Sequence, residues 1–376
     1  MLSWGDEGSG HVAGELIGRA AAPIRGHRDL ALDLLRGYFL VVIMIDHLRY
    51  AANPLYLVSG HKSLWVTAAE GFVLISGLLV GMLRGDQART AGWAAASRHL
   101  VRRAGVLALW CALLTIAFRL ISFATGYWPD VPNGDLRGTL VEDLVGAITL
   151  RHTYGDHNLL AAYALFLIIA PLALAAMLRG LTWLVVVASL ALWAAAYRFH
   201  LAWSDSVQSD LCWQLLFTFG MVIGFHRAAL TRRWTALSPR ARRAILVAGA
   251  VASFAIIIGS VLRLPIDGIY PTRLEGYAFD RNRLGPGRAA CAVVLVATLY
   301  AAIRTFEAPL VRTIGALFVP LGQASLYVYI VQSLATFVLV DDAMANLGLA
   351  LAINLALIGA VWLMVKYRVW FGVIPR

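Results

Sequence analysis

The sequence predicts an all-α fold, a polytopic membrane helix bundle of about ten transmembrane helices with both termini in the cytoplasm. Hydrophobic residues make up 60% of the 376 positions and charged residues only 14%, against about a quarter in soluble chains. The mean hydropathy is +0.73. Arginines cluster in short segments between apolar runs, as they do in the cytoplasmic loops of membrane proteins. These features exclude a cytosolic enzyme, a nucleic-acid-binding domain and a disordered protein.

Apolar segments of about 20 residues, the length that spans a bilayer, follow one another along the chain. In order they cover 30–50, 65–83, 100–121, 158–178, 181–199, 209–226, 244–263, 288–304, 314–339 and 346–366. Only Arg179 and Gly180 lie between the fourth and the fifth, and the glycine predicts a tight helical hairpin. The ninth carries Pro320 and Gly322 near its start, so its first part is expected to lie at the membrane interface.

The distribution of charge sets the predicted orientation. The net charge is +11, and most basic residues fall on segments that are cytoplasmic when the N-terminus is inside. An even number of spans then returns the C-terminus to the same side. We expect a cytoplasmic tail at 1–28, one membrane domain at 29–367 and a second cytoplasmic tail at 368–376.

The first apolar segment contains ionisable residues, which are costly in a membrane and therefore functional candidates. At 100° per residue, Asp33, Arg36 and His47 fall within an arc of about 80° on one helix face. Arg36 and His47 are separated by about 16 Å along the axis. An arginine near the inner side suits binding of a polar group, and an imidazole towards the outer side suits proton chemistry. The alternative is a structural Asp33–Arg36 pair and a hydrogen-bonded core histidine.

Arg36 and His47, with ten residues between them, resemble the Arg-x10-His signature of the acyltransferase-3 transmembrane superfamily. Within that superfamily the chain is most similar to the OpgC-type proteins, which are named for succinylation of osmoregulated periplasmic glucans. The similar stretches are 32–37 with 46–47, 68–77, 158–172, 213–217 and, more loosely, 321–329. Together they extend from about residue 29 to 335.

The resemblance implies a transmembrane O-acyltransferase of the bacterial inner membrane. It would move a succinyl or acetyl group from cytoplasmic acyl-CoA to a hydroxyl of an extracytoplasmic glycan or glycolipid, without a metal and without nucleic acid. His47 would be the general base or the relay that carries the acyl group, and Arg36 with Asp33 would hold it or the donor in place. Glu70 in the second segment either orients His47 or pairs with Arg36 or another arginine, and the sequence does not choose between these.

Further residues are candidates for binding the two substrates. Arg98 and Arg102 lie four residues apart on one helix face and could bind one anion together. With Arg103 they form the donor site that the resemblance implies; the alternative is ordinary cytoplasmic flanking charge. The predicted acceptor-binding residues are His157, Asn158, Trp213, Gln214 and Tyr329, with Gln323 and Ser325 lining the same cavity.

Three other motifs are weighed with these. His152 and His157 flank Asp156, but a His-x4-His spacing is not the usual zinc spacing, so a metal site is not expected. Many acyltransferase-3 relatives carry a histidine in the motif of the ninth segment, whereas the nearby polar residue in this sequence is Gln332, so a role that needs that histidine is not implied here. Gly77-x-x-x-Gly81 is expected to serve close helix packing.

A second function class remains open at this point. In a transporter or flippase of a glycan or lipid-linked substrate, Asp33, Arg36 and Glu70 would form an ion relay. Transporters often show inverted repeats and paired broken helices, and neither is evident in the sequence. A structural membrane scaffold is the least favoured reading, because three ionisable residues share one helix face.

Overall fold

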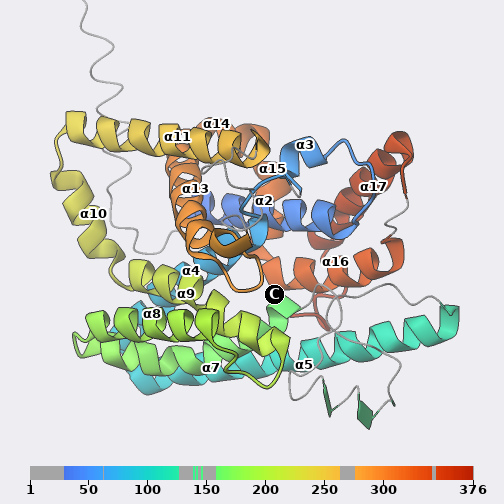
Figure 1. The fold of residues 1–376 in the computed structure, drawn as a ribbon, viewed down its shortest axis with the longest axis horizontal. Helices are drawn as coiled ribbons and strands as arrows, with labels where there is room; N and C mark the ends of the chain where they lie inside the picture. The colour runs from blue at the N-terminus through green and yellow to red at the C-terminus, as the bar shows by residue number, and fades with distance from the viewer. Residues whose placement is uncertain are drawn as a thin grey trace, which may run out of the picture.

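The computed structural model describes residues 29–61, 63–126, 139, 141–142, 145–146, 158–262, 276–340 and 344–375. Within this part of the chain every regular element is a helix (Figure 1). The helices are α2 (Leu30–His47), α3 (Tyr56–Ser59), α4 (Ala68–Ala91), α5 (Trp93–Thr125), α7 (Asn158–Leu178), α8 (Thr182–Arg198), α9 (Asp205–Phe225), α10 (Arg227–Ala236), α11 (Pro239–Leu262), α13 (Pro286–Thr305), α14 (Glu307–Thr313), α15 (Gly315–Gln323), α16 (Ser325–Leu339) and α17 (Leu347–Lys366). The predicted all-α class is therefore confirmed for the described residues.

Each of the ten predicted apolar segments contains a helix, but fewer qualify as membrane spans on their own. By length and composition, six helices in the described ranges could cross a membrane. They are α4, α5, α7 from Leu159, α11, α13 and α17. The α15–α16 pair, bent by 96°, would make a seventh if counted as one span. The chain is thus a multi-pass membrane-type bundle, and the number of about ten spans and the sides of the termini stay predictions.

Helices α4 and α5 extend furthest beyond their predicted limits. We expected the second helix at 65–83, but α4 begins at Ala68, where Thr67 caps it, and continues to Ala91. It continues because charged and polar residues such as Arg84 and Gln87 sustain a helix beyond the apolar stretch. Gly92, with φ of +87°, ends it, and α5 starts one residue later. Gly180, with φ of +79°, forms the tight α7–α8 turn that the sequence predicts.

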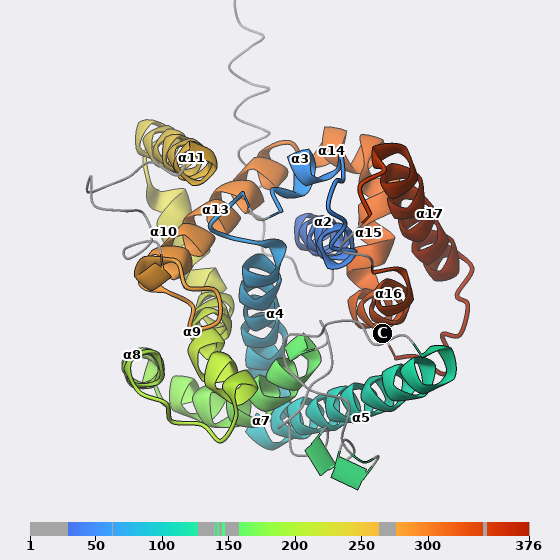
Figure 2. The same cartoon turned by 45° about the vertical axis from the view of Figure 1, so that its right-hand side comes forward.

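Helix α2 lies at the centre of the bundle. Most of its residues from Ala31 to Ile45 are buried, and the view along its axis in Figure 2 shows other helices on every side of it. It packs most extensively on α15, and α4, α16 and α13 also contact it. Because α2 is enclosed by protein, it can carry charged residues that a lipid-facing helix would avoid.

Among the described helices, α4 and α9 pack against each other most extensively. A Cβ added at Gly77 would overlap the Phe217 carbonyl oxygen, and one added at Gly81 would overlap that of Met221. On α9, Gly220 and Gly224 lie in the same way against carbonyl oxygens of α4. These small residues let the two backbones touch. The packing role predicted for Gly77-x-x-x-Gly81 is confirmed.

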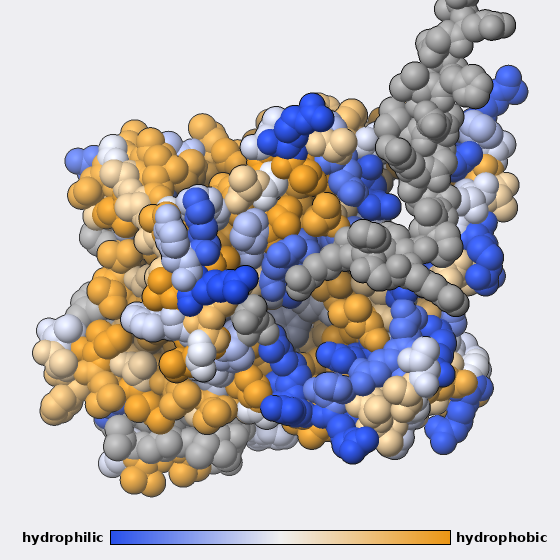
Figure 3. All heavy atoms as spheres, turned by 180° about the vertical axis from the view of Figure 1, so that it is seen from behind, coloured by the Kyte–Doolittle hydropathy of each residue, from blue (hydrophilic) through white to orange (hydrophobic). Residues whose placement is uncertain are grey.

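The surface agrees with a membrane setting. Seen from behind in Figure 3, apolar side chains cover most of the face and hydrophilic ones gather mainly towards one end. Helix α11, for example, exposes Val251, Phe254 and Val261. At the other end of the chain, the Tyr327 hydroxyl donates to the Val369 carbonyl at 2.7 Å, so the predicted C-terminal tail packs back on α16. The predicted N-terminal tail at 1–28 lies outside the described residues.

Candidate functional site

The α2 helix carries the central candidate residues on one continuous face. The Asp29 side chain caps the helix by accepting from the Leu32 amide at 3.2 Å, and the helix then runs unbroken from Leu30 to His47. Arg36 and His47 therefore share a face and are separated by about 16 Å along the axis, as the spacing predicts.

The end of this face that carries Asp33 and Arg36 meets the break between α15 and α16. The Asp33 carboxylate is buried and accepts from the Gln323 amide at 3.0 Å, while the Arg36 guanidinium donates to the Ser325 hydroxyl. Gln323 is the last residue of α15 and Ser325 the first of α16. The bend thus brings the Gln323 side chain to Asp33 and the Ser325 side chain to Arg36.

Close packing holds this crossing together. A Cβ at Gly37 would overlap the Phe318 carbonyl oxygen, and one at Gly322 would overlap the Asp33 carbonyl oxygen. Gly322, which the sequence suggested only as the sign of an interfacial start, is therefore the residue that lets α15 lie against α2. The contact fixes Gln323 and the following bend relative to Asp33.

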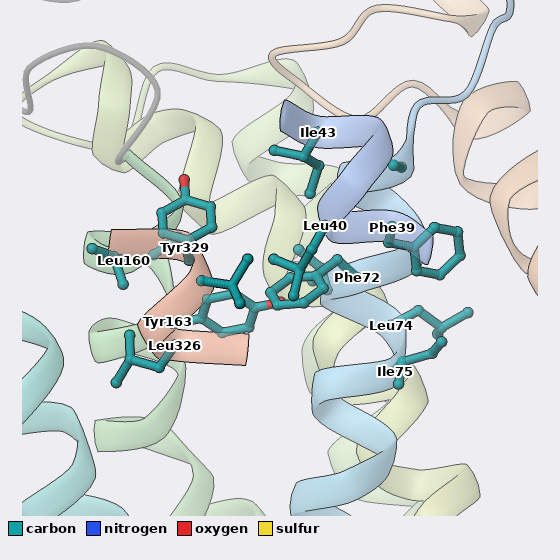
Figure 4. Packing of buried hydrophobic residues seen from close by; sticks show 14 of the residues in the cluster. Phe39, Leu40, Ile43, Phe72, Leu74, Ile75, Leu160, Tyr163, Leu326 and Tyr329 are labelled. Atoms are coloured by element: carbon teal, nitrogen blue, oxygen red, sulfur yellow. The ribbon is translucent and has the colours of Figure 1, made fainter. Parts of the chain in front are cut away.

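Aromatic and aliphatic side chains surround the charge of Arg36. The Phe72 ring centroid lies 6.0 Å from the guanidinium carbon, and Tyr163 meets Phe72 edge-on with centroids 5.9 Å apart. Figure 4 shows Tyr163, Phe72 and Leu40 converging from α7, α4 and α2. An ion in such a water-poor setting interacts strongly with any polar ligand that reaches it.

The end of the face that carries His47 has a different character. His47 is the last residue of α2 and is half-buried. The Oδ1 atom of its neighbour Asp46 lies 3.4 Å from Nδ1 of His61, and the His61 ring stacks on Tyr56 at 4.2 Å between centroids. The C-terminus of a helix favours positive charge, which suits an imidazole that accepts a proton.

His61 is a residue that the sequence argument missed. It reaches Asp46 because the chain folds back through α3 and Gly60, where φ is +70°. A short loop of this kind leaves no periodic pattern, so only the nearby acid in the first helix hinted at a partner.

Glu70 lies in the second helix as expected, in the first turn of α4. Its Oε2 accepts from the Thr67 amide at 2.9 Å and hydroxyl at 2.6 Å, which is a capping box. Its Oε1 accepts from Arg288 of α13, and both side chains are buried. Of the alternatives for Glu70, pairing with another arginine is the one these contacts support. The Thr-x-x-Glu pattern was the available signal.

The predicted donor arginines divide between two faces of α5. Arg98 and Arg102 are exposed, opposite the buried face that contains Ala96 and Leu100. Arg103 turns inward and is half-buried. It lies close enough to Arg84 of α4 for the two positive charges to repel each other.

The predicted acceptor residues are also separated. Gln214 is tied to α8, since its Oε1 accepts from the Ser189 hydroxyl at 2.8 Å and its Nε2 donates to the Ser189 carbonyl at 2.9 Å. Trp213 donates to the Arg281 carbonyl at 3.0 Å. Tyr329 instead lies beside α2 on α16, where Figure 4 shows it across from Leu40. These contacts therefore do not gather Trp213, Gln214 and Tyr329 into one rim.

Other residues proposed from the sequence fall outside the description. His152, Asp156 and His157 are not among the described residues, and Asn158 begins α7 without a described side chain. Among the residues that are described, no cluster of three or more His, Cys, Asp or Glu could hold a metal ion.

Comparison with known proteins gives one result. A family model described as "OpgC protein" matches residues 28–373, which is nearly the whole chain. Neither the curated proteins nor the solved structures yield a match.

Proposed function

The chain belongs to the OpgC protein family, and from that premise we propose that it is a transmembrane acyltransferase that modifies an extracytoplasmic glucan. The donor is a cytoplasmic acyl-CoA carrying a succinyl or acetyl group, and the acceptor is a glucan hydroxyl on the other side of the inner membrane. The proposal includes a place in the acyltransferase-3 superfamily and cytoplasmic termini.

One observation supports this proposal more than any other. Arg36 and His47 share a face of α2, and α2 is enclosed by the other helices. A donor on one side and an acceptor on the other require reactive groups inside the bundle, within reach of both. An enclosed polar face that extends about 16 Å along a helix axis meets this need.

The proposed chemistry uses His47 as a general base. Its imidazole takes the proton of the acceptor hydroxyl while the hydroxyl oxygen attacks the thioester carbonyl carbon. The carbon–sulfur bond then breaks, the acyl group stays on the acceptor oxygen, and the CoA thiolate takes up a proton to leave as the thiol. In the relay form of the mechanism His47 attacks first and carries the acyl group, and the acceptor oxygen then displaces it.

The inner residues have a binding and positioning role in this scheme. Asp33 and Arg36 are attached to the two helix ends at the α15–α16 break, which fixes the inner end of the face. On the donor side, Arg103 with the nearby Arg84 offers two positive charges towards the bundle. Such a pair suits the phosphates of CoA, and it replaces the exposed Arg98–Arg102 pair as the favoured donor contact.

Purified protein in lipid nanodiscs tests the function directly. It is incubated with radiolabelled succinyl- or acetyl-CoA and a glucan, and label on the glucan is measured for wild type, His47→Ala and His200→Ala. Wild type and His200→Ala, a change of an exposed histidine, should transfer label, and His47→Ala should be slower by about 10²–10⁴-fold. Unchanged transfer by His47→Ala would exclude the assigned base, and glucan or lipid movement without label transfer would indicate a transporter.

A further inference from the structure

Gln332 of α16 is a buried amide whose side chain has no hydrogen-bond partner in the described part of the chain. Its side chain is 0% exposed, and neither Nε2 nor Oε1 bonds to any described residue. Its polar neighbours are satisfied locally, because Ser333 donates to the Tyr329 carbonyl and Thr336 to the Gln332 carbonyl, both at 2.8 Å. A buried amide that lacks both partners is unfavourable unless something absent from the polypeptide completes it.

The position of Gln332 follows from the register of α16 on α2. Arg36 meets Ser325 and the Tyr50 hydroxyl meets the Leu339 carbonyl, and each pair is separated by 289 residues. The two helices therefore run in the same direction, as Figures 1 and 2 also show. With this register, Gln332 lies at the level of Ile43, between Arg36 and His47.

The Gln332 side chain also faces α2. At 100° per residue it lies only about 20° around the helix from Ser325, whose hydroxyl contacts Arg36. It is thus on the face of α16 that meets the Arg36–His47 face of α2. Four residues of helix separate the level of Ile43 from that of His47, a rise of about 6 Å.

The chemistry of a free amide indicates its ligand. Nε2 can donate and Oε1 can accept, so the complementary group is another amide, with one N–H and one C=O. Acyl-CoA carries such a group in its pantetheine arm, two methylene carbons from the thioester sulfur. A spacer of this length lets the thioester carbonyl lie about one helix turn, roughly 5.4 Å, beyond the amide. This is comparable to the axial rise of about 6 Å from the level of Ile43, where Gln332 lies, to that of His47.

We propose that Gln332 binds the pantetheine amide nearest the thioester, with Oε1 accepting from its N–H and Nε2 donating to its carbonyl. The thioester carbonyl is then held at the level of His47. This inference rests on the proposed function, since it assumes a donor with a pantetheine arm that enters from the Arg36 side.

The proposed contact of Gln332 with the donor amide is tested by measuring acyl transfer from two donors by each of two proteins. One donor is the S-acyl thioester of N-acetylcysteamine, which keeps the amide, and the other is the S-acyl thioester of pentanethiol, which replaces it by hydrocarbon. The proteins are wild type and Gln332→Met, a near-isosteric change that removes the amide. Asn354→Leu is the control, because Asn354 of α17 is also a buried amide with an unpartnered oxygen.

Wild type should prefer the amide-containing donor by about tenfold in kcat/KM, the effect of one or two hydrogen bonds. Gln332→Met should show no preference between the donors and should melt at the wild-type temperature or above, and Asn354→Leu should keep the preference. An equal preference in wild type and Gln332→Met would overturn the inference.

A second measurement separates this inference from the proposed function. If wild type transfers no label from any donor, the proposed function fails, and thermal stabilisation by pantetheine relative to pentanethiol then decides the inference alone. Stabilisation by pantetheine of wild type but not of Gln332→Met would support an amide-binding site. Equal stabilisation of both proteins, or of neither, would refute it.

Discussion

The α4–α9 and α2–α15 crossings both depend on glycines that place one helix against the carbonyl oxygens of another. At α4–α9 the glycines recur on both helices, and the helices stay together over several turns. At α2–α15 the contact is short, because α15 ends at Gln323 and the chain bends by 96°. The long crossing buries apolar surface, and the short one presents polar side chains from a helix break to Asp33 and Arg36. The comparison suggests that the same packing device builds a scaffold where helices continue and a site where one stops.

The largest effect is expected from filling the long crossing. In Gly220→Val the added atoms would overlap the Leu74 carbonyl oxygen, which cannot move without separating α4 from α9. We expect no folded protein to be recovered, as judged by size-exclusion chromatography in detergent. Gly105→Val is the control, since nothing lies within 4 Å of a Cβ at that helical glycine. Normal recovery of Gly220→Val would contradict the scaffold role.

The second largest effect is expected at Glu70, whose contacts with Thr67 and Arg288 indicate a structural role. Glu70→Gln leaves Arg288 buried without its carboxylate, at an expected cost of about 3–5 kcal/mol. Thermal unfolding should show a large loss, and Glu70→Gln combined with Arg288→Met should recover much of it. If Glu70→Gln instead melts normally and only slows transfer, Glu70 belongs with the catalytic residues after all.

A smaller loss of stability and a clear loss of function are expected at the short crossing. Gly322→Ala places a methyl group against the Asp33 carbonyl oxygen and should cost about 1–3 kcal/mol. Because Gln323 and Ser325 would shift, acyl transfer should fall by more than the stability change explains. Gly359→Ala, at a helical glycine with open space around it, serves as the reference. Equal losses in both variants would mean that the bend does not position the site.

The smallest effect is expected from substituting the arginines of α5, where the half-buried Arg103 and the exposed Arg102 are compared. Arg103→Gln should raise the KM for acyl-CoA by about tenfold, the loss of one charged hydrogen bond, because Arg103 turns inward beside Arg84. Arg102→Gln, at an exposed position, should change KM by less than about twofold. A larger rise in KM for Arg102→Gln than for Arg103→Gln would instead favour Arg98 and Arg102 as the donor-binding pair.

Sequence reasoning located the helices and one face of the site, but not the contacts that complete it. Apolar runs predict helices from their length alone, and helical periodicity places Arg36 and His47 on one face whatever surrounds them. The contacts of Asp33 with Gln323 and of Asp46 with His61 depend on a bend and a loop. Such contacts arise from tertiary packing, which local patterns do not encode. Glu70 was placed in the correct helix, but the Thr-x-x-Glu capping box present in the sequence was not used to choose among its possible partners.

The enclosure of α2 also bears on how the protein is made. Asp33 emerges early in synthesis, yet its partner Gln323 follows 290 residues later, a delay of about 15–60 s at typical elongation rates. During that interval a segment with three charged residues must wait in the insertion machinery or beside other nascent segments, where membrane quality control can reach it. Weakening the late partners should therefore lower the amount of protein that reaches the membrane before any effect on turnover is measured.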